Sequence, residues 1–298
     1  MTAPRYATAA ALRTALERRL RAQHASTALP LDRLRKEAAL QRLLARIVAV
    51  APEGSWALKG GIAMIARVGD RARATADADA TWRSSRSELG GVLDRAAGLD
   101  LADFFEFTIG QARPIQGEGV EGGIRFPVTA RLASKVFENM RIDVNIVAGD
   151  PRPVEMIALR NLMDFAGVPP VVVPAIRPDQ QLAEKLHAYT RDYGSQENGR
   201  AKDLYDMLVI AHELPIPSRT SLAAACRQTF QMRRTEWPPT LKQPPRSWSR
   251  AWRGFVADYR IEFANLDSAY EAVVAFWQPV LAEAGPASTW NADTWTWS

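Results

Sequence analysis

Residues 58–64 read Leu-Lys-Gly-Gly-Ile-Ala-Met, and residues 73–79 read Arg-Ala-Thr-Ala-Asp-Ala-Asp. The first stretch carries a pair of glycines where a short strand, expected over 55–58, gives way to a helix expected over 62–68. The second carries two aspartates two positions apart in a strand expected over 76–82, so both carboxylates point to one face of that strand. These stretches place a glycine turn and a pair of carboxylates within one sheet-forming part of the chain.

Asp77 and Asp79 form a candidate site for a divalent cation. A hard cation such as Mg²⁺ prefers oxygen ligands, and two carboxylates with a third from elsewhere are the usual contribution of a protein. Asp143 is the natural third ligand, because it lies in a strand expected over 136–147 whose apolar residues point to the opposite face. Each aspartate taken singly is more often a surface or turn residue, so the interpretation depends on their order along the chain.

Gly60 and Gly61 suit a phosphate-binding turn. Without a Cβ their backbone amides can approach a triphosphate closely, and the N-terminus of the following helix attracts negative charge. Most Gly-Gly pairs are simply turns, so this pair gains its meaning from its position about sixteen residues before Asp77.

The rest of the chain mixes helical and strand patterns and then becomes helical. Helices are expected, from apolar residues at three- and four-residue spacing, over 7–23, 31–50, 87–97, 179–193, 201–212, 218–232, 249–257 and 266–282. Further strands are expected, from alternation, over 104–111, 125–134 and 136–147, the first two joined by a glycine-rich run over 117–123. Prolines cluster between residues 151 and 178, which indicates a passage from the sheet to another kind of structure.

These patterns predict an α+β protein in three parts. A helical pair over 1–50 precedes a core over 51–175, in which helices pack on a mixed sheet, and a helical domain follows over 176–298.

Composition excludes several classes of protein. The chain has 298 residues, of which 47% are hydrophobic, enough for one large domain or two ordinary ones. No stretch reaches the roughly 18 uncharged apolar residues of a membrane-spanning helix, and no secretory signal is recognisable, so a cytoplasmic protein is expected. One cysteine and three histidines supply little for a disulfide framework, a zinc site or a Ser-His-Asp triad. Carboxylates therefore have to carry any chemistry.

Basic residues are concentrated near the C-terminus. The formal net charge is +5, and nine Lys/Arg stand against two acidic residues between Arg219 and Arg260. Trp237, Trp248 and Trp252 are interleaved with them, a composition that suits a structured RNA with a single-stranded end. The alternative, equally open, is that the tryptophans fill a core while the arginines are solvated.

The order of these motifs resembles that of the polymerase-β-type nucleotidyltransferases: a Gly-Gly pair, an Asp-x-Asp strand and a later strand with one aspartate. Two motifs in the helical half are similar to those of the AbiEii-type nucleotidyltransferase toxins, which include the mycobacterial MenT group and are the toxic halves of type IV toxin-antitoxin systems. They read Gln181-Leu-Ala-Glu-Lys-Leu-His-Ala188 and Arg200-Ala-Lys-Asp-Leu-Tyr-Asp206. The resemblance spans about residues 58–206.

The resemblance implies roles for individual residues. It matches the phosphate-binding glycines to Gly60 and Gly61, the metal-binding pair to Asp77 and Asp79, a phosphate-binding lysine to Lys185, and a C-terminal aspartate required for activity to Asp203. Lys59 and Arg73 flank these motifs and join the nucleotide-binding candidates. Two positions depart from the family's pattern: Ala78 stands where many relatives have a bulky apolar residue, and Ala76 where many have a hydroxyl.

Without the resemblance, several of these residues have ordinary interpretations. Lys185 would be a solvated or snorkelling lysine on an amphipathic helix, and Asp203 a first-turn residue that favours the helix dipole. His187 is interpreted as a hydrogen-bonded packing residue, and Cys226 as a small core residue.

The resemblance also implies an activity. We expect transfer of a nucleoside monophosphate from an NTP to the 3′ end of tRNA, with Mg²⁺ or Mn²⁺ as cofactor and Asp143 helping to activate the attacking oxygen. A cognate AbiEi-like antitoxin is the implied protein partner, and a monomer is expected. The alternatives are transfer to a protein or small molecule, which predicts an acidic rather than a basic cleft, and an inactive nucleic-acid-binding relative.

Overall fold

The computed structural model describes residues 5–27, 29–75, 77–115, 122–194, 197–259, 261–282 and 288–298. The chain divides into two compact units. The sheet unit comprises residues 1–69 and 74–176, and the helical unit comprises residues 70–73 and 177–298. The helical pair expected over 1–50 is grouped with the sheet in the first unit. Ala76 and most of the glycine-rich run over 117–123 lie outside the described residues.

The sheet unit is built on a mixed sheet, of which eight strands fall within the described residues. These are β1 (Trp56–Lys59), β2 (Asp77–Trp82), β3 (Phe105–Ile109), β4 (Arg113–Ile115), β5 (Gly123–Leu132), β6 (Lys135–Ile146), β7 (Val154–Ala158) and β8 (Val172–Ile176). They lie in the order β3-β5-β6-β2-β1-β8-β7, with β4 paired to β5. Because β2 runs parallel to β6 and antiparallel to β1, the prediction of a mixed sheet is confirmed.

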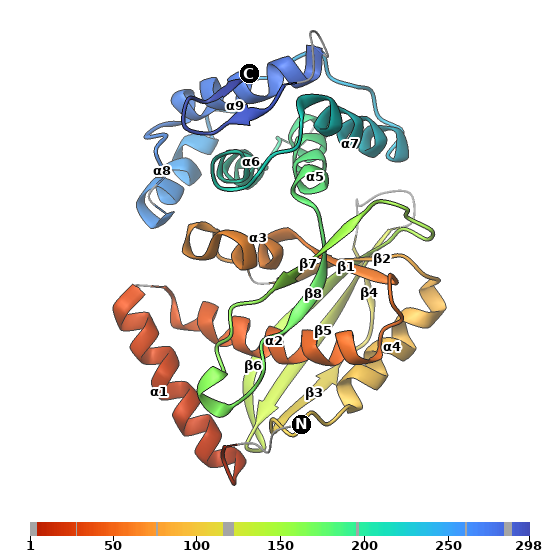
Figure 1. Ribbon diagram of the computed structural model, residues 1–298, viewed down its shortest axis with the longest axis vertical. Helices are drawn as coiled ribbons and strands as arrows, with labels where there is room; N and C mark the ends of the chain where they lie inside the picture. The colour runs from red at the N-terminus through yellow and green to blue at the C-terminus, as the bar shows by residue number, and fades with distance from the viewer. Residues whose placement is uncertain are drawn as a thin grey trace. The chain divides into compact units, whose positions relative to one another are not determined.

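Helices cover one face of this sheet. They are α1 (Ala9–Thr27), α2 (Leu31–Val50), α3 (Gly60–Val68) and α4 (Arg86–Gly98), with short 3-10 turns at Gly69–Arg71 and Asp164–Ala166. α2 and α4 lie side by side on the face (Figure 1), where Leu44 and Val92 meet Ala78 and Ile142 in an apolar layer. The positions of these helices agree with the sequence prediction to within a few residues.

The opposite face of the central strands is polar. Along β2, Ala78 and Ala80 are buried while Asp77 and Asp79 are only partly covered, and β6 alternates in the same way around Asp143. The alternation predicted from the sequence therefore holds, with apolar side chains beneath α2 and α4 and carboxylates on the other face.

Three strands of the sheet, β4, β7 and β8, were missed by the sequence prediction. β7 and β8 fall in the proline-rich segment, where a proline argues against a strand because it has no backbone donor. β8 forms nevertheless, with Pro174 opposite Met156 of β7. Its pairing with β1 consists of Leu58 opposite Ala175. The proline-rich segment therefore contains two strands at one edge of the sheet, and the chain leaves the sheet only after it.

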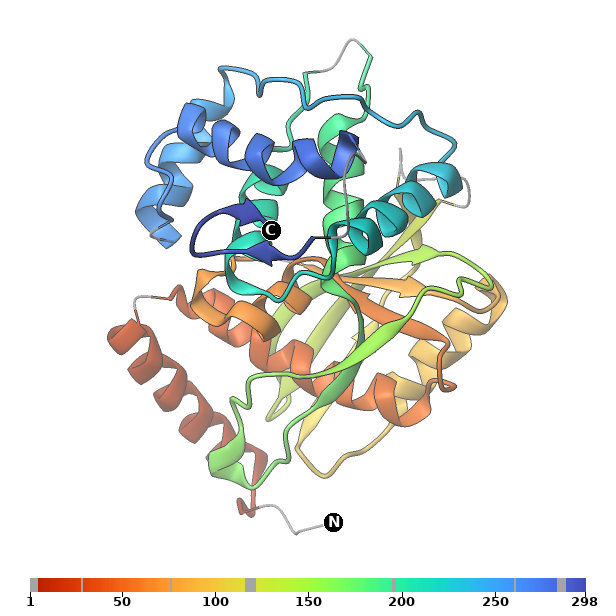
Figure 2. The same cartoon turned by 45° about the horizontal axis from the view of Figure 1, so that its top comes forward.

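The helical unit contains α5 (Pro178–Thr190), α6 (Ala201–Glu213), α7 (Arg219–Met232), α8 (Trp248–Tyr259) and α9 (Leu266–Ala282). Each was predicted from its periodicity. A hairpin of β9 (Trp290–Asn291) and β10 (Thr296–Trp297), which was not predicted, lies alongside α9 (Figure 2). Its indole N–H groups at Trp295 and Trp297 donate to the carbonyls of Ala272 and Phe276 in that helix. Among the described residues, no helix combines the length and the apolar character needed to cross a bilayer.

Candidate functional site

The turn between β1 and α3 places Gly60 against Asp79. Lys59 ends β1 directly opposite Asp79 of β2, and Gly60 follows with a φ of +63°. A Cβ built on Gly60 would lie 2.0 Å from Oδ2 of Asp79. Only glycine therefore accommodates both this backbone conformation and this position of the carboxylate.

Gly61 is required by a second close approach. A Cβ there would lie 2.5 Å from Cβ of Thr75, whose hydroxyl donates to the carbonyl of Asp77 at 3.1 Å. From the sequence, we expected a triphosphate to occupy the space that the two missing Cβ atoms leave open. In the structure, side chains of the protein itself occupy it, and the glycines lock the start of α3 onto the strand that carries the aspartates.

The three aspartates of the sheet lie along its polar face and are here called the aspartate patch (Asp77, Asp79 and Asp143). Asp143 of β6 stands at the same register as Asp79 of β2. It accepts two hydrogen bonds from Arg125 of β5, at 2.8 and 2.5 Å. Asp77 accepts two from Arg141 of β6, at 2.6 and 3.2 Å. Asp143 is thus paired with Arg125, and Asp77 with Arg141.

Arg125 interacts electrostatically with all three aspartates of the patch. Its hydrogen bond to Asp143 raises the pKa of the guanidinium, partial burial opposes this, and the negative charges of Asp143, Asp77 and Asp79 raise the pKa further. Within the described ranges, no group of three or more carboxylate, histidine or cysteine side chains is arranged as a ready metal cage. The patch is a set of carboxylates along two neighbouring strands, with arginines serving as counter-ions.

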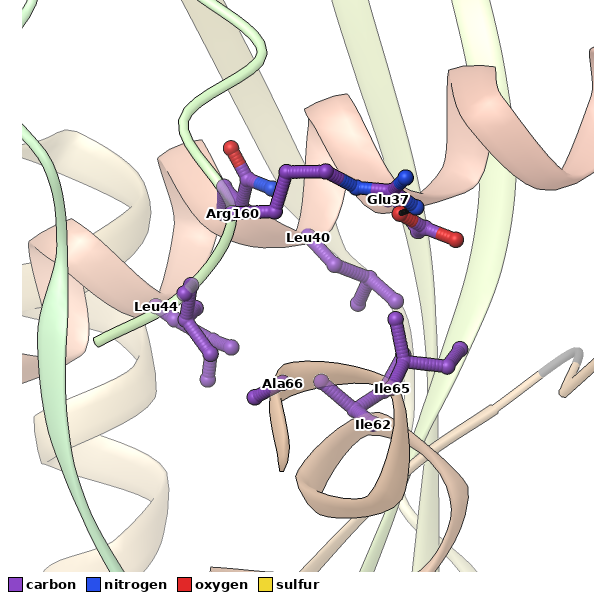
Figure 3. Close-up of a pocket in the computed structure, with 9 residues that line it drawn as sticks. Glu37, Leu40, Leu44, Ile62, Ile65, Ala66 and Arg160 are labelled. Atoms are coloured by element: carbon purple, nitrogen blue, oxygen red, sulfur yellow. Dashed lines mark hydrogen bonds and ion pairs between the residues drawn. The ribbon is translucent and has the colours of Figure 1, made fainter. Parts of the chain in front are cut away.

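The helix that begins at Gly60 is anchored from behind. In the close-up of Figure 3, Leu40 of α2 faces Ile62 and Ile65 of α3 across a cavity of about 20 Å³. Arg160 closes this contact by donating to Oε2 of Glu37 at 2.7 Å. Packing against α2 therefore fixes α3, and with it the turn that supports Asp79.

A second group of functional candidates lies in the helical unit and is here called the ionic cluster (Arg73, Lys185, Asp203 and Asp206). Nζ of Lys185 on α5 contacts Asp203 at 2.8 Å and Asp206 at 2.5 Å, both on α6. Arg73 donates two hydrogen bonds to Asp206, each of 3.0 Å. The side chains of Lys185, Asp203 and Asp206 are 11%, 4% and 3% exposed, so the interpretation of Lys185 as a solvated lysine is wrong.

Charge complementarity holds the cluster together despite its burial. Burial lowers the pKa of the Lys185 ammonium, but the carboxylates of Asp203 and Asp206 outweigh it and leave the pKa raised. Burial likewise raises the pKa of Asp206, while Lys185 and Arg73 outweigh it and leave that pKa below its usual range. One oxygen of Asp203 is buried with no hydrogen-bond partner among the described residues.

Asp206 was not among the predicted site residues, although it ends the quoted motif. A signal was present, because Asp203 and Asp206 are three residues apart and share one face of a helix. The sequence could not show that the segment 70–73 packs with the helical unit. There Arg71 pairs with Glu213, and its carbonyl accepts from Tyr205.

The residues interpreted as structural are buried. His187 is 3% exposed, lies close to Oγ1 of Thr235 at 3.1 Å, and has its pKa lowered by burial to about 4. Cys226 is fully buried. Both interpretations are confirmed.

The tryptophans of the basic segment decide between its two interpretations. Trp248 is 4% and Trp252 0% exposed, and their indole N–H groups donate to the carbonyls of Asn198 and Phe263. The interpretation of these two rings as stacking platforms for RNA bases is therefore wrong, and they are core residues. The basic side chains around them, Lys242, Arg246, Arg250 and Arg253, are exposed.

The fold and the sheet site define a class. A solved structure similar to the chain is that of MenT4, a nucleotidyltransferase toxin from Mycobacterium tuberculosis, with a TM-score of 0.53 and 17% identity over 95% of this chain and 92% of its own. A candidate nucleotidyltransferase from H. pylori gives a TM-score of 0.40 and 14% identity over 82% of this chain and 95% of its own. The likeness to MenT4 identifies a nucleotidyltransferase-toxin fold. None of the curated proteins compared with the chain matches its sequence.

The family follows from the sequence. Residues 42–275 match the family described as nucleotidyl transferase AbiEii toxin, type IV toxin-antitoxin system. The chain therefore belongs to this family and is a nucleotidyltransferase toxin of a type IV system. Such enzymes use an NTP and a divalent metal, and the family implies an antitoxin partner.

Proposed function

We propose that this toxin transfers a nucleoside monophosphate from an NTP to the 3′ end of tRNA in the cytoplasm, releasing pyrophosphate and stopping translation. The observation that carries the proposal is the carboxylate of Asp79 locked against Gly60 at the start of α3. A helix N-terminus favours phosphate, and a carboxylate favours a divalent cation. The two requirements of nucleotidyl transfer thus meet at one turn.

The donor set of the aspartate patch fits Mg²⁺ or Mn²⁺. Carboxylate oxygens from Asp77 and Asp79 would hold the ion, with Asp143 at the same register on the next strand. When bound, the ion supplies charge neutralisation for the transferring phosphoryl group.

The remaining steps belong to side chains of the chain itself. Asp143 accepts the proton of the attacking hydroxyl, a role that requires Arg125 to loosen its two hydrogen bonds. On the sheet unit, the phosphates would lie next to Lys59, Gly60 and Gly61, outside the space that the side chains of Asp79 and Thr75 fill.

In the helical unit, Lys185 provides positive charge for the nucleotide's phosphates. Asp203 and Asp206 hold the ammonium in place, and Arg73 acts through its pair with Asp206. Asp203 is therefore a positioning residue.

An RNA acceptor is supported by charge. Arg246, Arg250 and Arg253 are exposed along α8 and just before it, and the chain carries a net charge of +5. A basic surface suits phosphodiesters, whereas transfer to a small cationic acceptor favours an acidic one. We further propose that the toxin is a monomer neutralised by an AbiEi-like antitoxin.

The test is incubation of the purified toxin with total RNA and each α-labelled NTP in turn, with Mg²⁺. Label entering RNA of tRNA size, resistant to removal of protein and lost when Asp79 is replaced, is the expected result. Label that stays with protein or with small molecules would overturn the RNA acceptor. The four reactions also identify the NTP that is used.

A further inference from the structure

A hollow lies on the sheet face beside the aspartate patch and is here called the arginine hollow. Its volume is about 390 Å³, and its lining residues are Arg113, Pro114, Ile115, Arg125, Pro127 and Arg141. They come from β4, β5 and β6. Arg125 and Arg141 line the hollow and also contact Asp143 and Asp77, so the hollow and the patch share side chains.

Two arginines of the hollow, Arg113 and Arg125, lie opposite each other, which is electrostatically unfavourable. Arg113 of β4 stands directly opposite Arg125 of β5 in the antiparallel ladder, and like charges at opposed positions destabilise a sheet. Asp143 balances Arg125. Within the part of the chain that the structure describes, Arg113 has no such carboxylate. Three guanidinium groups line one hollow, and among the described residues carboxylates pair with two of them, Arg125 and Arg141. Such a concentration of guanidinium groups is typical of a site for an anionic ligand.

The order of the strands separates this site from the expected triphosphate position. Across the face, β4, β5 and β6 carry the arginines, β6 and β2 carry the aspartates, and β1 leads into α3. The aspartates therefore lie between two anion-attracting features. One is the start of α3, which the proposed function assigns to the NTP, and the other is the arginine hollow.

We propose that the arginine hollow binds the phosphodiester backbone of the acceptor RNA next to its reacting 3′ end. This inference rests on the proposed function, because it needs an RNA acceptor. Bidentate guanidinium groups match phosphate oxygens, and the apolar surfaces of Pro114, Ile115 and Pro127 provide contact for a ribose or base. An acceptor held there reaches Asp143 from the side opposite α3.

The test uses Arg113→Gln in the full chain, because Arg113 contacts none of the aspartates. Fluorescence anisotropy with a labelled 12-nucleotide single-stranded RNA, in EDTA and without NTP, gives the affinity at several salt concentrations. The slope of log K against log salt should flatten by about 0.7 of a unit for the loss of one contact to single-stranded RNA. Arg113→Lys should keep most of the slope. Arg95 is an exposed arginine on α4, on the opposite side of the sheet from the hollow, so Arg95→Gln should leave the slope unchanged.

Titration of fluorescent ATP, GTP, CTP and UTP analogues, each alone with Mg²⁺, separates the acceptor from the nucleotide. Unchanged nucleotide affinity in Arg113→Gln, together with the flatter RNA slope, supports the proposal. Weakened nucleotide binding with an unaltered RNA slope would place the triphosphate in the hollow and overturn it. An unaltered slope in a toxin that still labels RNA would overturn this inference alone, whereas wild-type toxin that labels no RNA would overturn the proposed function with it.

Discussion

Gly60 sets the position of the Asp79 carboxylate, and this can be separated from backbone strain by a matched pair of variants. Gly60→Ala introduces a Cβ 2.0 Å from Oδ2 of Asp79, whereas Gly69→Ala, at a φ of +58°, meets nothing within 4 Å. Both variants place an alanine at positive φ, and Gly69 also has a ψ of −122°, so each carries backbone strain and loses thermal stability. We expect the clash with Asp79 only in Gly60→Ala, and therefore loss of nucleotidyl transfer only in that variant. Equal activity in the two variants would show that the carboxylate position is not critical.

Asp79 is the residue on which the proposed chemistry depends most. Asp79→Asn keeps the shape of the side chain but removes the charge that a metal ligand needs, so transfer should fall by about 10²-fold or more. Circular dichroism and thermal melts should remain close to wild type. Asp94→Asn, an exposed aspartate on α4, is the control and should keep full turnover. Wild-type turnover in Asp79→Asn would remove this residue from the site.

At the scale of elements, the ionic cluster joins α5 to α6. A replacement of Lys185 therefore changes both the stability of the fold and the charge offered to the nucleotide. Lys185→Met leaves Asp203 and Asp206 buried with less positive charge, at a cost of about 3–5 kcal/mol for a broken buried pair. Lys202→Met removes an exposed lysine from α6 and should cost little. Thermal melts and nucleotide titrations of both variants check this, and equal melting temperatures would contradict the burial argument.

The stability loss in Lys185→Met should change with pH in a definite direction. In the wild type the pKa of Asp206 is depressed, so its contribution to stability is complete above the unfolded value of about 3.9 and is lost only as the pH falls below it. In Lys185→Met, burial without the ammonium raises the pKa of the Asp206 carboxyl, so the loss of stability is present at neutral pH and shrinks as the pH approaches about 4. Melts at pH 7 and pH 5 measure it. A deficit that grows on acidification would contradict the assignment.

α8 presents a second contrast, between its buried ring and its exposed cation. Trp252→Ala should cost about 3–5 kcal/mol because it empties a core position, and every activity should fall together. Arg250→Gln, two residues earlier and exposed, should leave the free energy of unfolding nearly unchanged. Denaturant unfolding of the two variants measures the contrast. Selective loss of RNA binding in a stable Trp252→Ala would restore the ring as a contact for bases.

At the scale of the whole molecule, the sequence predicted what periodicity and local spacing control. Period two in β2 and β6 placed Asp77, Asp79 and Asp143 on the uncovered face, and period 3.6 placed α5 to α9. It did not predict β8, because its proline hides a strand whose formation depends on partners far along the chain. The counter-ions Arg125 and Arg141, and the place of Arg73 beside Asp206, depend on register and on the path of residues 70–73, for which no local signal exists.

The distribution of charge over the surface supports one further prediction, for RNA binding by the helical unit. Replacing Arg246, Arg250 and Arg253 together by glutamine should flatten the dependence of log K on log salt by about two to three units if all three contact backbone phosphates. Stability should stay close to wild type, because all three side chains are exposed. The control removes three other exposed arginines, Arg18 and Arg21 of α1 and Arg95 of α4, which changes the net charge equally. Filter binding with bulk tRNA at several salt concentrations distinguishes a local surface from overall charge. Equal flattening in the two triple variants would mean that net charge alone attracts the RNA, and flattening only in the control would assign the RNA surface to the sheet unit.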